Sequence, residues 1–312
     1  MSGPLLKPTK KHRVLLVDDE EDVHLVTRMS LKGLRFQDRR MEFLSAMSGQ
    51  EALEIMRTEP NIAVVLLDVV METDHAGLDV CRAIRGELEN PFVRILLRTG
   101  QPGAAPEKKV IQEYDIDGYL PKGELTSTRL FTAVRTALKT YYEIVELERY
   151  RRNLAAIHDC VVSLHAYEPI ETTLERLLGT VTTICPVPLA VLQLETFEEE
   201  GNPQQYFLYR SQEDDAVAAE AAAEHVAMRV AAESVHRGEP TPRVFEDGFL
   251  VPLRLDHELG YGWIYLQEPE PDEIIRHSLP LLAAHGANAI YSAVTHAMLS
   301  NREGDLFDQM QI

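Results

Sequence analysis

The sequence has little cysteine and no long apolar run. Among its 312 residues are three cysteines, Cys81, Cys160 and Cys185, which lie far apart without the spacing of a metal site. We therefore expect buried or idle thiols in a reducing compartment, and a cytoplasmic location. No apolar stretch reaches the length of a membrane span, and none follows the basic N-terminus as in a signal peptide.

The second half also has little positive charge. Residues 1–140 carry 20 Lys and Arg against 21 Asp and Glu, whereas residues 141–312 carry 11 against 29 and no lysine. The net charges are therefore −1 and −18. Because proteins that bind duplex DNA neutralise phosphates with a basic face, we expect no nucleic-acid partner. Hydrophobic residues make up 45% of the chain, enough for packed cores, and the length suits two domains.

Short apolar runs alternate with helical patterns through the first half. The expected strands are 13–18, 41–47, 62–68, 93–99 and 118–122, and the expected helices are 21–34, 49–59, 78–87, 107–114 and 126–144. Five strands that each precede a helix predict a doubly wound α/β domain, with a five-stranded parallel sheet covered on both faces.

Polar side chains end four of these strands. Asp18 and Asp19 end the first, Asp68 the third, Thr99 the fourth and Lys122 the fifth. Ligands bind at the carboxyl ends of parallel strands, so we expect these groups to converge in one cleft. Three carboxylates repel one another unless a cation joins them, and oxygen ligands suit Mg²⁺. A lysine and a threonine on the same rim suit a phosphoryl group. One acid before a helix is more often a cap, but the four strand ends together favour the functional interpretation.

The first half resembles the receiver domain of two-component response regulators, which has a flavodoxin-like fold. The resemblance covers residues 13–140 and rests on VLLVDDE (14–20), LLDVVM (66–71), Gly77, LRTG (97–100) and YLPK (119–122). It implies that Asp68 is the phosphoacceptor and takes a phosphoryl group from a sensor histidine kinase or a phosphotransfer protein. It also implies that Asp19 and Asp68 bind Mg²⁺ directly. Asp18 would act through water or from just outside the ion's ligands, and the backbone carbonyl of Val70 would be a further ligand.

The resemblance implies catalytic and switch residues as well. Lys122 would pair with the phosphoryl oxygens, Thr99 would be the switch hydroxyl, and Tyr119 would be the aromatic residue that follows its movement. No residue that binds an organic cofactor is expected. The sequence departs from the family where Met71 is followed by Glu72 instead of proline, and the segment before Gly77 is one residue longer.

The helix that begins at residue 126 is expected to continue as a joining helix over residues 139–166. Apolar or aromatic residues fall at 147, 150, 154, 157, 161 and 164, in alternating steps of three and four. This pattern favours a parallel coiled coil between two chains, and so a homodimer. The alternative is an amphipathic helix packed on its own domain. The His158-Asp159 pair has no further ligands at a recognisable spacing, so we interpret it as a surface pair rather than a hydrolase metal site.

The second half alternates helices and strands in another order. Helical patterns cover 169–185, 213–236 and 272–301, and strand patterns cover 187–195, 204–211, 242–246, 248–256 and 260–268. This order predicts an α+β domain, and the hairpin FLVPLRLDHELGYGWIYLQ (249–267) resembles that of GAF domains, which bind small ligands or dimerise. The expected organisation is a receiver domain (12–138), a linker helix (139–166), a GAF-like domain (167–302) and a C-terminal tail (303–312).

Two functions are consistent with this organisation. The first is a phosphorylation-controlled response regulator that relays its switch through a helix to a GAF-like sensor or dimerisation domain. In that case we expect no enzyme, because the residues show no catalytic output domain. The second is the regulatory part of a cyclic-di-GMP phosphodiesterase or cyclase whose catalytic domain lies beyond residue 312. A DNA-binding regulator conflicts with the charge of −18 in the second half.

Overall fold

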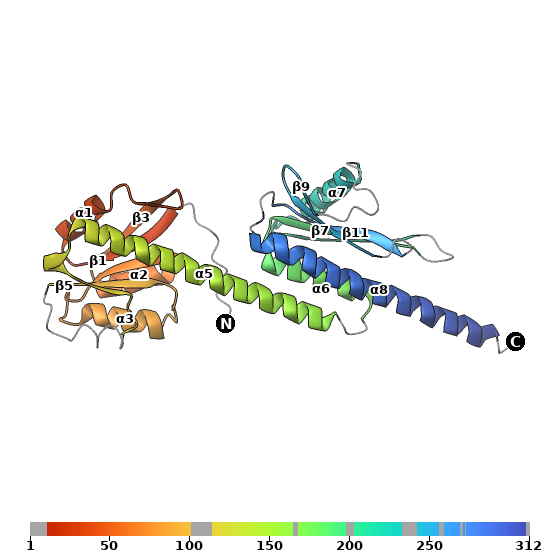
Figure 1. The fold of residues 1–312 in the computed structure, drawn as a ribbon, viewed down its shortest axis with the longest axis horizontal. Coiled ribbons are helices and arrows are strands. Elements are labelled where there is room, and N and C mark those ends of the chain that lie inside the picture. The colour runs from red at the N-terminus through yellow and green to blue at the C-terminus, as the bar shows by residue number, and fades with distance from the viewer. Residues whose placement is uncertain are drawn as a thin grey trace. The chain divides into compact units, whose positions relative to one another are not determined.

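The computed structural model divides the chain into two compact units, residues 1–149 and 150–312 (Figure 1). It describes residues 11–100, 114–164, 168–197, 203–232, 242–255, 259–268, 271 and 273–309. Within these residues each unit contains one sheet. The expected helix over 107–114 lies, apart from its last residue, outside the described residues.

The first unit has a six-stranded sheet in the order β2-β3-β1-β4-β5-β6. Five of its strands run parallel: β1 (Lys11–Val17), β3 (Arg39–Ala46), β4 (Ile62–Asp68), β5 (Arg94–Thr99) and β6 (Gly118–Pro121). The described helices of this unit are α1 (Glu21–Ser30), α2 (Gly49–Thr58), α3 (Ala76–Gly86), a 3₁₀ turn at Lys122–Glu124 and the start of α5. The predicted parallel α/β fold is therefore confirmed.

The sixth strand, β2 (Arg35–Phe36), was not predicted. It pairs antiparallel with β3, and the helix expected over 21–34 ends already at Ser30. Gln37 and Asp38 form the turn between β2 and β3, with positive φ angles of 47° and 58°. Positive φ at both central residues gives the turn a twist that matches the paired strands. A two-residue strand has no periodicity, so the hydrophobic pattern could not reveal it.

The sheet of the first unit buries a different core on each face, because alternate residues of a strand point in opposite directions. One core joins strand residues Leu15, Val65 and Leu97 to α2 and α3. The other joins Leu16 and Leu66 to the start of α5. Burial on both faces explains why the central strands read as continuous apolar runs.

Helix α5 (Ser127–Ser163) begins in the first unit and ends in the second. Val134 is buried in a core of the first unit, and Ile157 and Leu164, just past the helix end, are buried in a core of the second. Between them, Leu147 and Leu154 are 68% and 65% exposed. The later half of the apolar stripe thus packs on its own unit, as the amphipathic alternative states, whereas the earlier half is exposed.

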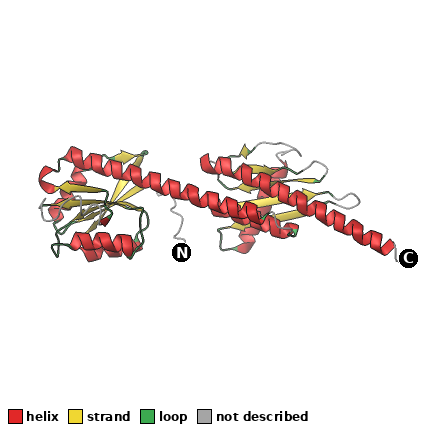
Figure 2. Cartoon of the chain, turned by 60° about the horizontal axis from the view of Figure 1, so that its bottom comes forward, coloured by secondary structure: helices red, strands yellow, loops and turns green. Residues whose placement is uncertain are grey.

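The second unit has a five-stranded antiparallel sheet in the order β8-β7-β11-β10-β9. Its strands are β7 (Leu189–Thr196), β8 (Gln204–Ser211), β9 (Arg243–Val244), β10 (Phe249–Leu253) and β11 (Gly260–Leu266). Its helices are α6 (Ile170–Ile184), α7 (Ala216–Ala232) and α8 (Glu273–Gln309). These elements follow the predicted order. Figure 2 distinguishes the helices of the chain from its strands by colour.

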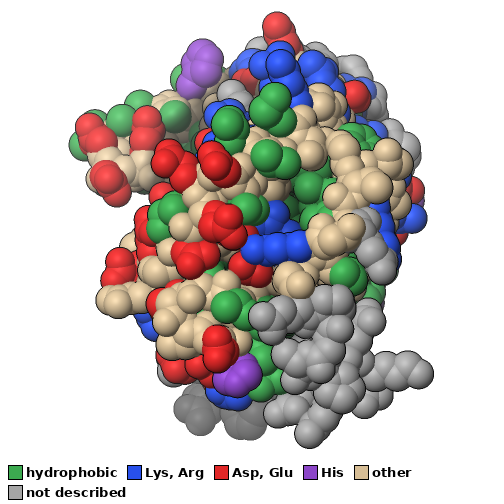
Figure 3. Space-filling view, turned by 90° about the vertical axis from the view of Figure 1, so that its left-hand side faces the viewer, with side chains coloured by type: hydrophobic (Ala, Val, Ile, Leu, Met, Phe, Trp, Pro, Cys, Tyr) green, Lys and Arg blue, Asp and Glu red, His purple; other side chains and the backbone are tan. Residues whose placement is uncertain are grey.

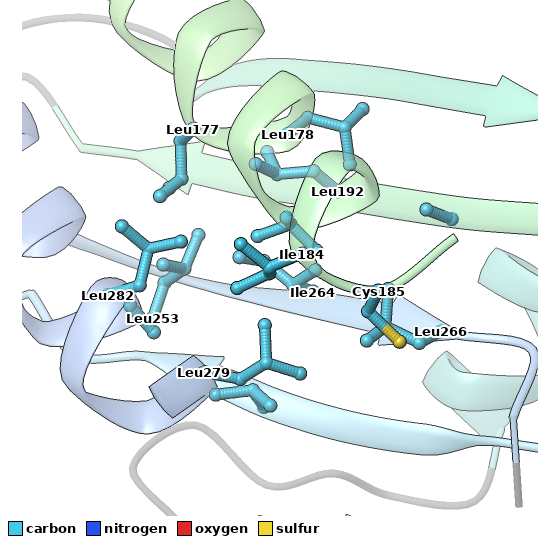
Figure 4. Close-up of a cluster of buried hydrophobic side chains, with 14 of the residues drawn as sticks. Leu177, Leu178, Ile184, Cys185, Leu192, Leu253, Ile264, Leu266, Leu279 and Leu282 are labelled. Atoms are coloured by element: carbon cyan, nitrogen blue, oxygen red, sulfur yellow. The ribbon is translucent and has the colours of Figure 1, made fainter. Parts of the chain in front are cut away.

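Helices cover both faces of this second sheet. The larger core lies between the sheet, α6, α8 and the end of α5, and includes Leu177, Ile264 and Leu282 (Figure 4). Gly286 lets α8 approach α6, because a Cβ there would lie 2.6 Å from the Leu177 side chain. The smaller core lies under α7 on the opposite face and includes Trp263. The second unit therefore has three layers.

The three cysteines are free and buried, as expected. Cys185 belongs to the larger core of the second unit, where Figure 4 shows it near Leu266. Burial raises the pKa of the Cys81 thiol to about 12, so this thiol stays protonated at neutral pH. In the part of the chain that the structure describes, no helix combines the length and apolarity needed to cross a membrane.

Candidate functional site

The carboxyl ends of β1, β4 and β6 bring three predicted residues together. Asp18 follows β1, Asp68 ends β4 and Lys122 follows β6. The Lys122 ammonium lies 2.7 Å from Asp68 Oδ2 and 3.4 Å from Asp18 Oδ2. Parallel strands that end at one edge of the sheet produce this convergence, although 104 residues separate Asp18 from Lys122 in the sequence.

A cluster of carboxylates stands beside this pair. Oxygen atoms of Asp18, Asp19 and Glu20 lie within 4.8 Å of one another, with Asp18 buried and the other two exposed. On the face drawn in Figure 3, acidic side chains gather beside a Lys or Arg side chain. These carboxylate oxygens are the type of ligand that Mg²⁺ takes, so the residues fit that ion. Glu20 was not among the predicted site residues, although it ends the VLLVDDE motif.

Asp68 is a buried carboxylate that accepts hydrogen bonds from two donors. It is 3% exposed, and its Oδ1 accepts a hydrogen bond from the backbone N–H of Val69 at 2.9 Å, while Oδ2 accepts from Lys122. Burial raises the pKa of Asp68, although the hydrogen bond and charge of Lys122 oppose this shift. Burial alone would lower the pKa of Lys122, but its hydrogen bond to Asp68 and the charges of Asp68 and Asp18 outweigh burial and raise it. The lysine therefore stays protonated beside the carboxylate.

The loop after Asp68 folds back onto the end of β4. Gly77 N–H donates to the carbonyl of Val69 at 3.1 Å, and Val69 N–H donates to the carbonyl of Arg98 at 3.0 Å. A Cβ on residue 77 would lie 2.0 Å from the carbonyl oxygen of Asp68, so only glycine fits. Val70 lies on this loop, two residues after Asp68, and its side chain is 40% exposed.

Glu72 anchors the same loop to helix α2. Its Oε1 accepts a hydrogen bond of 2.9 Å from the backbone N–H of Gly49, the first residue of α2. A carboxylate at a helix N-terminus satisfies a free N–H and interacts favourably with the helix dipole. This contact gives a physical reason for the glutamate at the position where the family commonly has proline.

The two predicted switch residues lie on neighbouring strands. Thr99 ends β5 and is 3% exposed, and Tyr119 lies on β6 directly opposite Leu97. Because alternate residues of a strand share a face, Thr99, Leu97 and Tyr119 lie on the same face of the sheet. Tyr119 packs partly buried against the core on that face.

A buried polar network next to Asp18 was not predicted. Arg98 donates from Nη2 to Asp18 Oδ2 at 2.7 Å and from Nη1 to the Thr27 hydroxyl at 2.8 Å. The His24 ring hydrogen-bonds the backbone carbonyl of Asp18 at 2.8 Å and the Ser45 hydroxyl at 3.0 Å. The available signal was the arginine inside the buried strand RILLRT, because a buried charge needs a partner. Its position in the LRTG motif gave no indication of which carboxylate it meets.

Comparison with protein families identifies the first unit. Residues 14–135 match the family model described as the response regulator receiver domain. This part of the chain therefore belongs to the response regulator receiver family. The resemblance that the sequence motifs indicated is thus confirmed for the first unit, and the second unit lies outside the matched residues.

A curated relative extends the similarity beyond the receiver domain. The chain is 42% identical over 171 residues to 3′3′-cGAMP-specific phosphodiesterase 2 of Vibrio cholerae serotype O1 (strain ATCC 39315 / El Tor Inaba N16961). The match covers 55% of this chain and 33% of the relative, so the chain spans about a third of that protein's length. Any continuous match of 171 residues within 312 includes residues 142–171, and so the later part of α5.

The prediction that the protein is not an enzyme is contradicted by this relative, whose name is that of a phosphodiesterase. The prediction rested on the absence of a recognisable active site within 312 residues. A receiver domain gives no information about the catalytic domains that accompany it, so that reasoning could not exclude an enzymatic output.

Three solved structures that resemble the chain each match less than half of it. One is described as the adenylate cyclase from Rhodopirellula baltica, with 23% identity, a TM-score of 0.38, and coverage of 44% of this chain and 95% of that one. Another is a response regulator receiver domain protein from Clostridium thermocellum, with 24% identity, a TM-score of 0.36, and coverage of 43% and 98%. A third is the signal receiver domain of an HD domain-containing protein from Pseudomonas fluorescens Pf-5, with 23% identity, a TM-score of 0.38, and coverage of 45% and 96%.

Proposed function

We propose that the first unit accepts a phosphoryl group on Asp68 from the phosphohistidine of a kinase or phosphotransfer protein. The observation that carries the proposal is the 2.7 Å contact between the Lys122 ammonium and Asp68 Oδ2 at the joint carboxyl ends of the strands. One carboxylate oxygen would attack phosphorus while the bond from phosphorus to the donor imidazole nitrogen breaks. The imidazole leaves with its electron pair and takes up a proton, and Lys122 balances charge on the transferred oxygens.

In the same proposal Asp18, Asp19, Asp68 and the backbone carbonyl of Val70 serve a Mg²⁺ ion. When bound, this ion neutralises charge on the phosphoryl oxygens. The support is chemical: the clustered side chains present only oxygen ligands, and Asp19 is exposed and able to reach an ion from solvent. Asp18 differs, because both of its carboxylate oxygens already accept hydrogen bonds from protein groups.

Thr99 and Tyr119 would change position when Asp68 is phosphorylated, and so transmit the change to the β5 and β6 face. The Thr99 hydroxyl would hydrogen-bond the new phosphoryl oxygen, and its inward movement would make room for Tyr119 to turn into the space beside β5. Their shared face of the sheet and the half-buried state of Tyr119 support this assignment. The change would be a shift between two packing arrangements of the β5 and β6 face.

The proposed donor is a sensor histidine kinase or phosphotransfer protein, and α1 offers a surface for it. Leu25, Val26 and Met29 are 57%, 61% and 66% exposed, and they lie on one side of a helix that begins three residues after Asp18. Exposed apolar side chains that gather in one place mark protein contacts. A cytoplasmic location, where such donors act, remains a prediction.

The test is phosphorylation of the purified protein by a small-molecule phosphodonor with Mg²⁺, followed by intact-mass measurement. We expect the mass of one phosphoryl group to appear in the wild type and in Asp74→Ala, and to be absent in Asp68→Ala. Asp74 is the matched control because it lies in the same loop and is exposed. Phosphorylation of the Asp68 variant at the wild-type rate would refute the assignment.

We also propose that the receiver controls a cyclic-dinucleotide phosphodiesterase. The observation that favours this is the 42% identity to the Vibrio cholerae phosphodiesterase, in a match that includes residues 142–171 and is therefore not confined to the receiver. The test is the hydrolysis of 3′3′-cGAMP by the complete gene product, with and without phosphodonor. We expect phosphodonor to change the rate in the wild type and in Asp74→Ala but not in Asp68→Ala. An equal response of all three proteins would contradict the proposal.

The second unit would receive the switch through α5. We propose that residues 12–138 act as the receiver, 139–166 as the transmitting helix, 167–302 as a GAF-like sensor or dimerisation domain, and 303–312 as a tail. The three-layered α+β arrangement around an antiparallel sheet supports the GAF-like assignment. The exposed Leu147 and Leu154 support pairing of two chains along the middle of α5. Light scattering before and after phosphorylation tests whether two chains pair. A protein that stays monomeric in both states would refute the pairing.

A further inference from the structure

Arg98 presents its charge directly to the acidic site. It is 4% exposed and lies one residue before Thr99, at a position of β5 that pairs with Asp68 of β4. Its side chain crosses β4 and reaches Asp18, which is fully buried, at 2.7 Å. A buried guanidinium and a buried carboxylate in contact form an ion pair that solvent screens little.

The pair is held in one orientation. The second guanidinium nitrogen of Arg98 donates to the Thr27 hydroxyl of α1 at 2.8 Å, so its two terminal nitrogens have different acceptors. On the other side, Asp18 Oδ1 accepts the backbone N–H of Glu20 at 3.1 Å, and Oδ2 also lies 3.4 Å from Lys122. Both oxygens of Asp18 are therefore occupied by protein donors before any ion arrives.

We propose that Arg98 is a positioning residue and a built-in counter-charge, which keeps Asp18 out of direct metal ligation and weakens Mg²⁺ binding at the acidic site. This inference rests on the proposed magnesium site. The carboxylates of Asp18, Asp19, Glu20 and Asp68 carry four negative charges, and Lys122 alone would leave three of them unbalanced. With Arg98 present, two are left to attract a divalent ion. The ion is then bound by Asp19 and Asp68, while Asp18 acts on it through its charge.

The same contacts connect the site to two other elements. Thr27 belongs to α1, which carries the exposed apolar surface proposed for the donor, and Arg98 is bonded through the chain to Thr99. An ion or phosphoryl group that displaced Arg98 from Asp18 would therefore pull on α1 and on the switch strand together. As a counter-charge, Arg98 must instead keep its contact with Asp18 when the ion binds.

The test compares Mg²⁺ affinity by isothermal titration calorimetry in the wild type, Arg98→Met, Arg98→Lys and Arg94→Met. Removing one positive charge next to the ion is expected to tighten Mg²⁺ binding in Arg98→Met by roughly tenfold or more. Arg98→Lys keeps the charge and should bind within about threefold of the wild type. Arg94→Met is the matched control, because Arg94 is a buried, ion-paired arginine at the other end of β5 and should also bind like the wild type.

Equal or weaker binding by a folded Arg98→Met would overturn the proposal. A second measurement uses the wild type alone: the guanidinium N–H signals of Arg98 are followed by NMR during titration with Mg²⁺. We expect them to remain slowly exchanging and hydrogen-bonded at saturation, whereas their loss would show Asp18 passing to the ion and would overturn the proposal without any variant. Absence of Mg²⁺ binding by the wild type would refute the magnesium site itself, which separates the two failures.

Discussion

Replacement of Gly77 by alanine tests the close packing behind the phosphoacceptor. The added Cβ would lie 2.0 Å from the carbonyl oxygen of Asp68 and 2.9 Å from Val69 Cα, and both are backbone atoms that cannot turn away. The loop must therefore shift. Forcing an extra carbon into a packed site costs typically about 1–3 kcal/mol, so we expect Gly77→Ala to be destabilised by at least about 2 kcal/mol. Phosphorylation of Asp68 should slow as well, because its backbone moves.

Gly86 supplies the matched control within the same helix. Nothing lies within 4 Å of a Cβ built there, and its backbone needs no positive φ. Alanine at this position should therefore stabilise the protein by roughly 0.5–1 kcal/mol through its higher helix propensity. The two glycines of α3 are thus expected to respond with opposite signs.

The assay is urea unfolding followed by far-UV circular dichroism, with tryptophan fluorescence as an internal reference. The one tryptophan of the sequence, Trp263, is buried in the second unit and reports on that unit. Two units need not unfold in one step, so the two signals are analysed separately. Equal midpoints for Gly77→Ala and Gly86→Ala in the circular dichroism signal would refute the geometric argument.

Three further predictions follow from single contacts. Lys122→Met should slow phosphorylation of Asp68 by roughly 100-fold or more, because a charged donor to the reacting oxygens is lost. The control Lys139→Met removes a lysine from an exposed ion pair and should react at the wild-type rate. Burial lowers the pKa of His12, so the folded state favours the neutral ring. The resulting stability should be fully present above the unfolded pKa of about 6.5 and should fall as the pH drops below it. The decrease of the urea midpoint between pH 7 and pH 5 should therefore be smaller in His12→Gln than in the wild type. Tyr265→Phe should destabilise the second unit by about 1 kcal/mol in the fluorescence assay, because its hydroxyl donates to a carboxylate and accepts from an arginine; an unchanged midpoint would contradict the importance of that network.

The sequence predicted the first unit well because its strands are buried on both faces. Each such strand is a continuous apolar run, and the polar residue that stops it marks the end of the sheet where ligands bind. Asp18, Asp68 and Lys122 were found in this way, and the structure places them within hydrogen-bond or ion-pair distance. The edge strand β2 was missed, because two residues carry no period.

The contacts between residues around the site were harder to predict than the residues themselves. Glu72 meets Gly49 across 23 residues, and Arg98 meets Asp18 across 80. Such pairings depend on which strands become neighbours and on which face each side chain leaves the sheet. A single sequence shows that a buried arginine needs an acceptor, but it does not show which of several acids provides it.

The joining helix shows a different limit of sequence reasoning. A stripe with steps of three and four is produced equally by a coiled coil and by packing on a neighbouring layer of the same unit. The structure divides the stripe: Ile157 is buried in the second unit's core, whereas Leu147 and Leu154 are exposed. Periodicity alone could not have located that division.

The most direct test of the phosphoacceptor assignment is to locate the acyl phosphate itself. The protein is treated with phosphodonor and Mg²⁺, the acyl phosphate is reduced with borohydride, and the modified residue is found by peptide mass spectrometry. We expect a single reduced aspartate, at position 68. Reduction at any other carboxylate, with residue 68 unmodified, would contradict the assignment.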